Sequence, residues 1–233
     1  MTQPLPIVLI PGLLASPRMY AAQIPQLWRW GPVMIADHTR DDSMGALAQR
    51  ILAAAPARFA LVGLSMGGYV SFEILRQAPE RIAKLALLDT SARPDTPEQT
   101  DSRLAQIALA TEGRMTEVVN ALFPRLVHRE RRDDAALRAV FTLMAEEVGA
   151  WGFIRQQTAI MGRSDSRPSL GRIRCPTLVL VGDGDELTPP DRAAEIAGGI
   201  PGAQLVTIAQ SGHVSTLERP EEVTRALLEW LRA

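Results

Sequence analysis

Short apolar segments that alternate with helical patterns constrain the fold of this chain more than any other feature of its sequence. These segments are rich in β-branched and aliphatic side chains and lie at residues 7–10, 33–36, 59–62, 85–88, 177–181 and 204–208. They are too apolar for half-exposed strands and are typical of strands buried on both faces of a parallel sheet. Residues 44–54 and 66–77 have the patterning of crossover helices, and Pro79 ends the second. The alternation predicts an α/β fold in which helices flank a mostly parallel sheet.

Residues 91–171 interrupt this alternation. The interval opens with Pro94 and Pro97 and contains no convincing strand. Its helix-like stretches lie near 98–110, 116–122, 133–147 and 151–161. A chain of 233 residues can bury one sizeable core, since α/β domains of roughly 200–250 residues are common as single units. We therefore expect one domain over residues 1–233, with an all-helical cap inserted at residues 91–171.

Composition and net charge indicate which kinds of molecule this chain can bind. The 46% apolar and 22% charged composition excludes a disordered, collagen-like or coiled-coil chain. With 25 basic and 26 acidic residues, the net charge of −1 provides no general attraction for nucleic acid or anionic membranes. No uninterrupted apolar run reaches the roughly 18 residues that a membrane span requires. We expect a small-molecule partner, no nucleic acid and no membrane, and the oligomeric state stays open.

The single cysteine, Cys175, bears on the cellular compartment and on the chemistry. It rules out an internal disulfide and a cysteine-rich zinc site, and it suits a reducing compartment. The apolar stretch 5–15 resembles a signal core, but no Lys or Arg precedes Arg18 and prolines interrupt it. We therefore expect a cytoplasmic protein. Cys175 precedes Pro176 at a strand entrance, so we expect a packed apolar side chain and not a nucleophile.

The sharpest local motif is the G-x-S-x-G pentapeptide from Gly63 to Gly67, with Ser65 at its centre. It follows the predicted strand 59–62 and opens a helical stretch, which is the context that a nucleophile elbow requires. In such an elbow the serine occupies a strained turn, and side chains two positions away would collide with neighbouring backbone. Glycine at both positions removes that collision. The alternative is an ordinary glycine-rich turn that only packs a helix against the sheet.

A serine nucleophile needs a base, and the chain offers three histidines. His213 lies in the loop after the predicted strand 204–208, and loops after parallel strands open on one sheet edge, so His213 can meet Ser65. His38 also follows a strand and is a candidate for a surface loop or a substrate contact. His128 falls in the helical insertion beside several arginines, where we expect a solvated role.

The base in turn needs a carboxylate to orient it. The loop after the predicted strand 177–181 supplies Asp183, Asp185 and Glu186. We choose Asp185, with Asp183 as its rival and Asp89 as a more distant possibility after an earlier strand. The loop could instead be a solvated acidic turn, or Asp185 could cap the turn that follows. A calcium site would need more alternating oxygen ligands and a closing glutamate.

The order Ser65, Asp185, His213 resembles that of the α/β-hydrolase fold family, in which Ser, Asp or Glu, and His follow one another. The resemblance covers nearly the whole chain: residues 7–14, the elbow, the helical insertion, residues 182–189 as G-x-x-D-x-x-x-P, and Gly212-His213 before the last helix. The chain looks most like the small, cap-bearing, cofactor-free carboxylesterases and enol-lactone hydrolases.

The resemblance implies a Ser-His-Asp triad in which Ser65 attacks a carbonyl, His213 takes its proton and Asp185 orients the imidazole. An acyl-enzyme would form and water would then hydrolyse it, with no metal and no organic cofactor.

The same resemblance places an oxyanion hole at the backbone N–H groups of Leu13 and Met66. Many family members carry His-Gly where this chain has Pro11-Gly12, and backbone N–H groups do not need that histidine. A purely structural turn after the first strand is the alternative.

Substrate contacts are less well defined. Trp151 and Phe153 could line an apolar acyl pocket or pack within the core and cap. Arginines in the insertion could indicate a carboxylate-bearing substrate, but 24 of the 25 basic residues are Arg, and we favour a solvated helix face. We expect a serine hydrolase of a small carboxylic ester, lactone or thioester. The alternatives are a same-fold C–C hydrolase or lyase with the same residues, and a non-catalytic small-ligand receptor.

Overall fold

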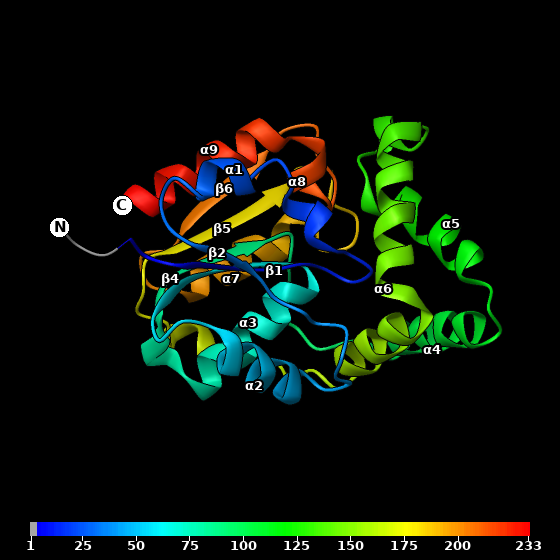
Figure 1. Ribbon diagram of the computed structural model, residues 1–233, viewed down its shortest axis with the longest axis horizontal. Helices are drawn as coiled ribbons and strands as arrows, with labels where there is room; N and C mark the ends of the chain where they lie inside the picture. Colours follow the sequence, from blue (N-terminus) through cyan, green and yellow to red (C-terminus); the bar gives the residue numbers. More distant parts are fainter. Residues whose placement is uncertain (1–3) are drawn as a thin grey trace.

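A computed structural model describes residues 4–233, which form the predicted α/β architecture (Figure 1). Within these residues six strands form one sheet in the order β2-β1-β3-β4-β5-β6, and each neighbouring pair is parallel. The strands are β1 (Ile7–Ile10), β2 (Val33–Ile35), β3 (Phe59–Leu64), β4 (Ile82–Leu88), β5 (Thr177–Gly182) and β6 (Gln204–Ile208). Every predicted strand is present, and the predicted fold class is confirmed.

Helices cover both faces of the sheet (Figure 1). On one face lie α2 (Met44–Ala54), α3 (Met66–Gln77) and α7 (Pro190–Gly199), and on the other lie α1 (Ile24–Leu27), α8 (Ser215–Glu218) and α9 (Pro220–Arg232). Successive strand residues point to opposite faces, so Val8 and Ile10 pack under α2 and α3 while Ile7 and Leu9 join the cluster under α9. Short 3₁₀ turns lie at η1 (Pro17–Tyr20), η2 (Pro79–Arg81), η3 (Arg129–Arg131) and η4 (Arg167–Arg172).

The two edge strands differ from the prediction that all strands are buried on both faces. β2 is half-buried throughout, and in β6 only Ile208 is buried while Leu205 is 44% exposed. The central strands β1, β3 and β5 are fully buried. The prediction is wrong for the edges because an edge strand has one neighbour, and the helices that cover the middle of the sheet leave its margin open to water.

The segment between β4 and β5 is helical, with α4 (Pro97–Thr111), α5 (Met115–Leu126) and α6 (Ala135–Met161). We call these three helices the helical insertion. They stand beyond one end of the sheet (Figure 1). Their buried side chains, such as Phe123 and Met144, belong to the same apolar cluster as Ile7 and Leu9 of β1. The insertion therefore shares a core with the sheet.

The two helices predicted at 133–147 and 151–161 are both present and follow one another within α6. The two segments meet at Gly149, whose backbone is not helical (φ 70°, ψ 168°). Glycine alone adopts that region readily because it has no Cβ. The chain can thus change direction inside one element.

None of the helices in residues 4–233 combines the length and the apolar composition needed to cross a bilayer.

Gly149→Ala should destabilise the protein through backbone strain alone, since a Cβ added there meets nothing within 4 Å. We expect the free energy of unfolding, measured in urea, to fall by about 1–3 kcal/mol. The matched control is Gly198→Ala in α7, where a Cβ also meets nothing but φ is not positive. That change should cost nothing or stabilise by about 0.5–1 kcal/mol. Equal effects of the two substitutions would contradict the strain at Gly149.

Candidate active site

Ser65 occupies the sharp turn between β3 and α3, with φ 54° and ψ −113°. This left-handed region costs a residue with a side chain about 1–3 kcal/mol and persists only where the surroundings hold it. Here the Ser65 N–H donates to the Leu88 carbonyl at 2.9 Å, and the Thr90 hydroxyl donates to the Ser65 carbonyl at 2.7 Å. The turn is therefore held in place from the neighbouring strand β4.

The two glycines of the pentapeptide allow this turn to form. A methyl group at Gly63 would overlap the carbonyl of Gly67, and one at Gly67 would overlap the carbonyl of Ile10. The start of α3 thus lies directly against β3 and β1, as the sequence predicts for an elbow. The Ser65 side chain is left standing at the carboxyl edge of the sheet.

Ser65, His213 and Asp185 form one hydrogen-bonded chain, although they come from loops after three different strands. Ser65 Oγ lies 2.7 Å from His213 Nε2, and His213 Nδ1 lies 2.8 Å from Asp185 Oδ2. The His213 and Asp185 side chains are only 4% and 0% exposed, while Ser65 is half-buried. The hydroxyl at the end of the chain is therefore the member that a small molecule can reach.

Asp185 is held by its own loop. The backbone N–H groups of Leu187 and Thr188 donate to Oδ1 at 2.8 and 2.9 Å, and the Thr188 hydroxyl donates to Oδ2 at 2.7 Å. These bonds turn the carboxylate toward His213. They leave Oδ2 as the acceptor for the imidazole N–H.

The other two acids considered from the sequence do not reach His213. Asp183 is exposed and accepts a bond from the Ser211 N–H at 3.2 Å. Asp89 is buried and accepts bonds from the Gly182 N–H and the Ser215 hydroxyl. Burial and the nearby charge of Asp185 raise the pKa of Asp89 to about 8, so it is protonated near neutral pH.

The pKa values of the Asp185–His213 pair move apart. Burial disfavours the charged imidazolium, but the charge and the hydrogen bond of Asp185 outweigh it and raise the pKa of His213 above 6.5. Burial likewise disfavours the Asp185 carboxylate, yet His213 and the Thr188 bonds lower the pKa of Asp185 below 3.8. The Asp185 carboxylate therefore stabilises the protonated form of His213.

The loop after β1 brings a second feature to Ser65. A Cβ placed on Gly12 would sit 3.3 Å from the Ser65 Cβ, so this loop lies directly against the elbow. The Gly12 carbonyl accepts bonds from His38 Nε2 at 2.8 Å and from the Ala15 N–H at 3.2 Å. Because N–H and C=O point opposite ways in a trans peptide, this turns the Leu13 N–H away from His38.

Some backbone N–H groups near Ser65 have no hydrogen-bond acceptor among residues 4–233. They include that of Leu13 and that of Met66 at the first position of α3, where helical N–H groups have no intrahelical partner. The next residue in the loop, Leu14, has φ 54° and donates its N–H to Gln156 Oε1 of α6 at 3.0 Å. The loop geometry is thus fixed on one side by His38 and on the other by Gln156.

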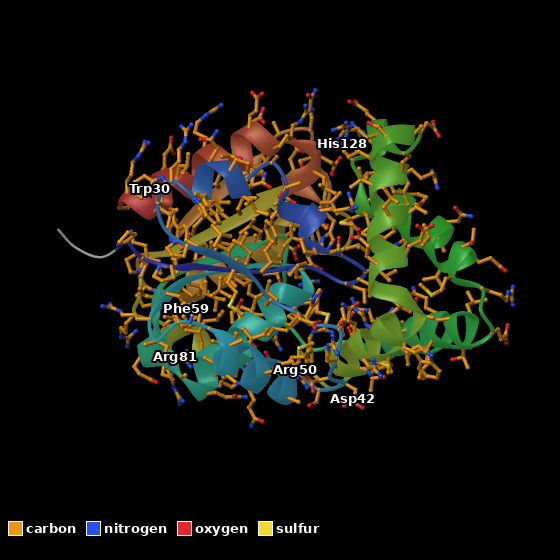
Figure 2. The ribbon with its side chains drawn as sticks, in the orientation of Figure 1. Trp30, Asp42, Arg50, Phe59, Arg81 and His128 are labelled. Atoms are coloured by element: carbon orange, nitrogen blue, oxygen red, sulfur yellow. The ribbon has the colours of Figure 1, made fainter. Side chains whose placement is uncertain are left out.

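The remaining two histidines differ from their predicted settings. His38 is 2% exposed and does not lie on the surface, and burial lowers its pKa so that it stays neutral. His128 is 8% exposed and packs against Gly184 and Gly212, between the insertion and the region of α8 (Figure 2). The prediction of a solvated His128 is wrong because the insertion folds back onto the loops that carry Asp185 and His213.

Sequence reasoning missed Glu218, which ties these parts together. The residue is 3% exposed, and its carboxylate accepts bonds from the Gly212 N–H at 2.7 Å and the His128 N–H at 2.8 Å. Burial raises its pKa. In the sequence Glu218 stands just before Glu221 and Glu222, so no local signal distinguishes it from a solvated acid.

A cavity of about 480 Å³ opens in front of Ser65 and His213. Its apolar wall comes from both the sheet and the insertion and includes Met19, Leu64, Leu122, Phe141 and Ile160. Its charged lining is dominated by arginine, including Arg103 and Arg163. Among residues 4–233 no cluster of three or more His, Cys, Asp or Glu side chains is arranged to hold a metal ion.

Trp151 and Phe153 do not line this cavity. Trp151 is 70% exposed, and Phe153 is fully buried in the apolar core. The prediction of substrate contacts is wrong for both because residues two apart in a helix lie on opposite faces, and here one face meets solvent and the other the core. Cys175 is half-buried and packs against the core, and burial raises the pKa of its thiol.

The chain is similar to known proteins over its whole length. The sequence pattern described as "Alpha/beta hydrolase family" matches residues 7–226. A thermophilic esterase from Thermogutta terrifontis, with malate bound, shares 30% identity at a TM-score of 0.90 and covers 99% of this chain and 90% of that one. The enol-lactonase from Burkholderia xenovorans LB400 shares 25% identity at a TM-score of 0.89, covering 98% and 92%. A pimeloyl-[acyl-carrier protein] methyl ester esterase from Aromatoleum aromaticum is 25% identical, covering 93% and 94%.

The Asp185–His213 contact predicts a titration that NMR of the imidazole can follow. In the unaltered protein the midpoint of His213 should lie above 6.5, and Asp185→Asn should lower it because the largest favourable charge and its hydrogen bond are lost. A raised folded pKa means that this contribution to stability is complete below the unfolded value of about 6.5 and is lost as pH rises through the folded value.

Asp183→Asn is the control, since that carboxylate is exposed and is not bonded to His213. It should leave the midpoint within about 0.3 units, below the usual scatter of protein pKa values. Similar shifts in the two variants would show that Asp185 has no special role in the ionisation of His213.

Proposed function

This chain belongs to the alpha/beta hydrolase family, and from that premise we propose a serine hydrolase that cleaves a small carboxylic ester, lactone or thioester through an acyl-enzyme. The observation that carries the proposal is the chain of hydrogen bonds from Ser65 through His213 to Asp185. Relatives named as esterase, methyl ester esterase and enol-lactonase support the substrate class. A cavity of about 480 Å³ suits a small molecule.

In the proposed first step Ser65 Oγ forms a bond to the carbonyl carbon while its proton moves to His213 Nε2, and the carbonyl π electrons move onto oxygen. Asp185 keeps the Nδ1 proton in place and stabilises the imidazolium. The tetrahedral intermediate then expels the alkoxide or thiolate, which takes the proton from Nε2. Water attacks the acyl-enzyme in the same way, so each step needs only these side chains and water.

We assign the oxyanion hole to the N–H groups of Leu13 and Met66, which have no other acceptor in the described chain. A donor aimed at the developing oxyanion can lower the barrier by about 3–4 kcal/mol. In this chain, His38 and Gln156 hold the loop that carries Leu13, although Pro11 stands where many family members have histidine. We infer that His38 positions the hole and does not itself touch the substrate.

We further propose that residues 91–171 act as a cap within a single domain. Leu122 of α5 and Phe141 and Ile160 of α6 form cavity walls opposite Ser65, so the insertion would select the substrate. The cytoplasm is our proposed compartment, supported by the presence of only one cysteine.

A fluorophosphonate probe should add one label to the protein, and Ser65→Ala should abolish both labelling and the hydrolysis of p-nitrophenyl esters. Loss of the nucleophile should cost at least about 10³-fold in kcat. Ser164→Ala, an exposed serine after α6, should label normally in intact-mass measurements. Ester turnover in Ser65→Ala at the original rate would end the serine mechanism. Turnover of a β-diketone with no ester hydrolysis would instead favour carbon–carbon cleavage.

His38→Leu should lower kcat about tenfold or more with little change in KM, because a misplaced donor acts on the transition state. His38→Gln should restore much of the rate, since its amide N–H can reach the Gly12 carbonyl. A trifluoromethyl ketone forms an oxyanion on Ser65, so its inhibition constant should rise by about the factor by which kcat/KM falls. A purely structural His38 would lower the melting temperature and leave that inhibition constant unchanged.

A further inference from the structure

Arg103, Asp95 and Arg163 form a compact ionic cluster at the cavity wall. Asp95 accepts bonds from Arg103 Nε at 2.7 Å and from Arg163 Nη1 at 2.6 Å. The side chain of Arg103 is 18% exposed, that of Asp95 2% and that of Arg163 6%. One carboxylate therefore faces two guanidinium groups, which leaves the cluster with one uncompensated positive charge away from bulk water.

The hydrogen bonds of Arg163 show where that charge is available. Its Nε donates to the Arg93 carbonyl at 3.0 Å, and Nη1 also donates to the Ile160 carbonyl at 3.1 Å. Its Nη2, with two N–H donors, has no hydrogen-bond partner among residues 4–233. The residue is 9% exposed and lines the cavity, so these donors can be satisfied by a molecule that enters it.

The cluster also lies close to the proposed nucleophile. The Arg163 guanidinium stacks over the Tyr69 ring, 4.4 Å from its centroid, and both residues line the cavity. Tyr69 lies four residues after Ser65 on α3, which corresponds to about one helical turn, or roughly 5–6 Å. An anion on Arg163 and a carbonyl held at Ser65 would therefore occupy the same cavity.

The other arginines of the cavity are arranged differently. Arg93 is matched by a two-point ion pair with Glu195, and Arg192 lies 3.3 Å from Asp191. Arg125 is exposed to solvent, as we expect for most arginines of the insertion. Among the arginines of the cavity in residues 4–233, Arg163 combines burial, an excess of positive charge in its cluster and Nη2 N–H donors without a partner.

We propose that Arg163, supported by Arg103, forms a carboxylate-binding subsite, and that the substrate is an ester or lactone that also carries a carboxylate. A half-ester of a short dicarboxylic acid has this chemistry. The subsite rests on the proposed hydrolase function, because it specifies the substrate of that site. A charge-assisted hydrogen bond of this kind is stronger than a neutral one and provides both affinity and orientation.

The test compares p-nitrophenyl hydrogen glutarate with p-nitrophenyl pentanoate, which has the same chain length without the charge. The unaltered protein should favour the anionic ester by about tenfold or more in kcat/KM. Arg163→Met should remove that preference through a higher KM for the anionic ester. The matched control is Arg138→Met on α6, whose guanidinium stacks on Phe123 and does not line the cavity. It should retain the preference.

The variant Asp95→Asn distinguishes a binding role of the cluster from a purely structural one, through the preference for the anionic ester. Removing the shared negative charge should raise the preference for the anionic ester, whereas a structural loss would slow both esters equally. Equal rates of the unaltered protein on the two esters, or a preference that survives in Arg163→Met, would overturn the subsite.

A binding measurement separates failure of the subsite from failure of the proposed function. Calorimetry with Ser65→Ala and the glutarate half-ester should show binding that is lost in Ser65→Ala/Arg163→Met. Such binding without turnover by the unaltered protein would refute the hydrolase and retain the subsite. Turnover of neutral esters without any binding of the half-ester would refute the subsite alone.

Discussion

The buried contact between Asp185 and His213 is the interaction on which the rest of the site depends. Both side chains are removed from water, and each is ionised favourably only because the other is there. The backbone N–H groups of Leu187 and Thr188 and the Thr188 hydroxyl hold the carboxylate so that Oδ2 points at the imidazole. The imidazole in turn presents Nε2 to Ser65, which the strained turn holds at the sheet edge. Without the buried pair, Ser65 would be an ordinary surface hydroxyl.

A second acid stands beside this pair, and its protonation keeps the charge distribution simple. Asp89 follows the neighbouring strand and is fully buried, and its raised pKa of about 8 keeps it neutral near pH 7. Two carboxylates in one desolvated region resist ionising together. Asp185 is the acid that bonds to His213, while Asp89 binds the Gly182 N–H and the Ser215 hydroxyl.

The helical insertion reaches the site through direct bonds as well as through its cavity wall. The Leu126 carbonyl at the end of α5 accepts the His213 N–H at 2.8 Å, and Glu218 bridges Gly212 to His128. Gln156 of α6 accepts the Leu14 N–H beside the first strand. The loops that carry the imidazole and the free N–H of Leu13 are thus held partly by the insertion. A change in the helices that shifts Leu126 or Gln156 would therefore also shift His213 or the loop that carries Leu13.

The sequence by itself determined the strands, the bounds of α2 and α3 and the elbow, because these depend on hydrophobic periodicity and on sterics between near neighbours in the chain. It also proposed which serine, histidine and acid could meet, since parallel strands end at one edge. Only the tertiary structure decided that Asp185 and not Asp183 contacts His213, that His128 and Glu218 are buried, and that Trp151 faces solvent. It also singled out Arg163 among many arginines. Burial and partners are set by segments far apart in the sequence, so no local pattern contains them.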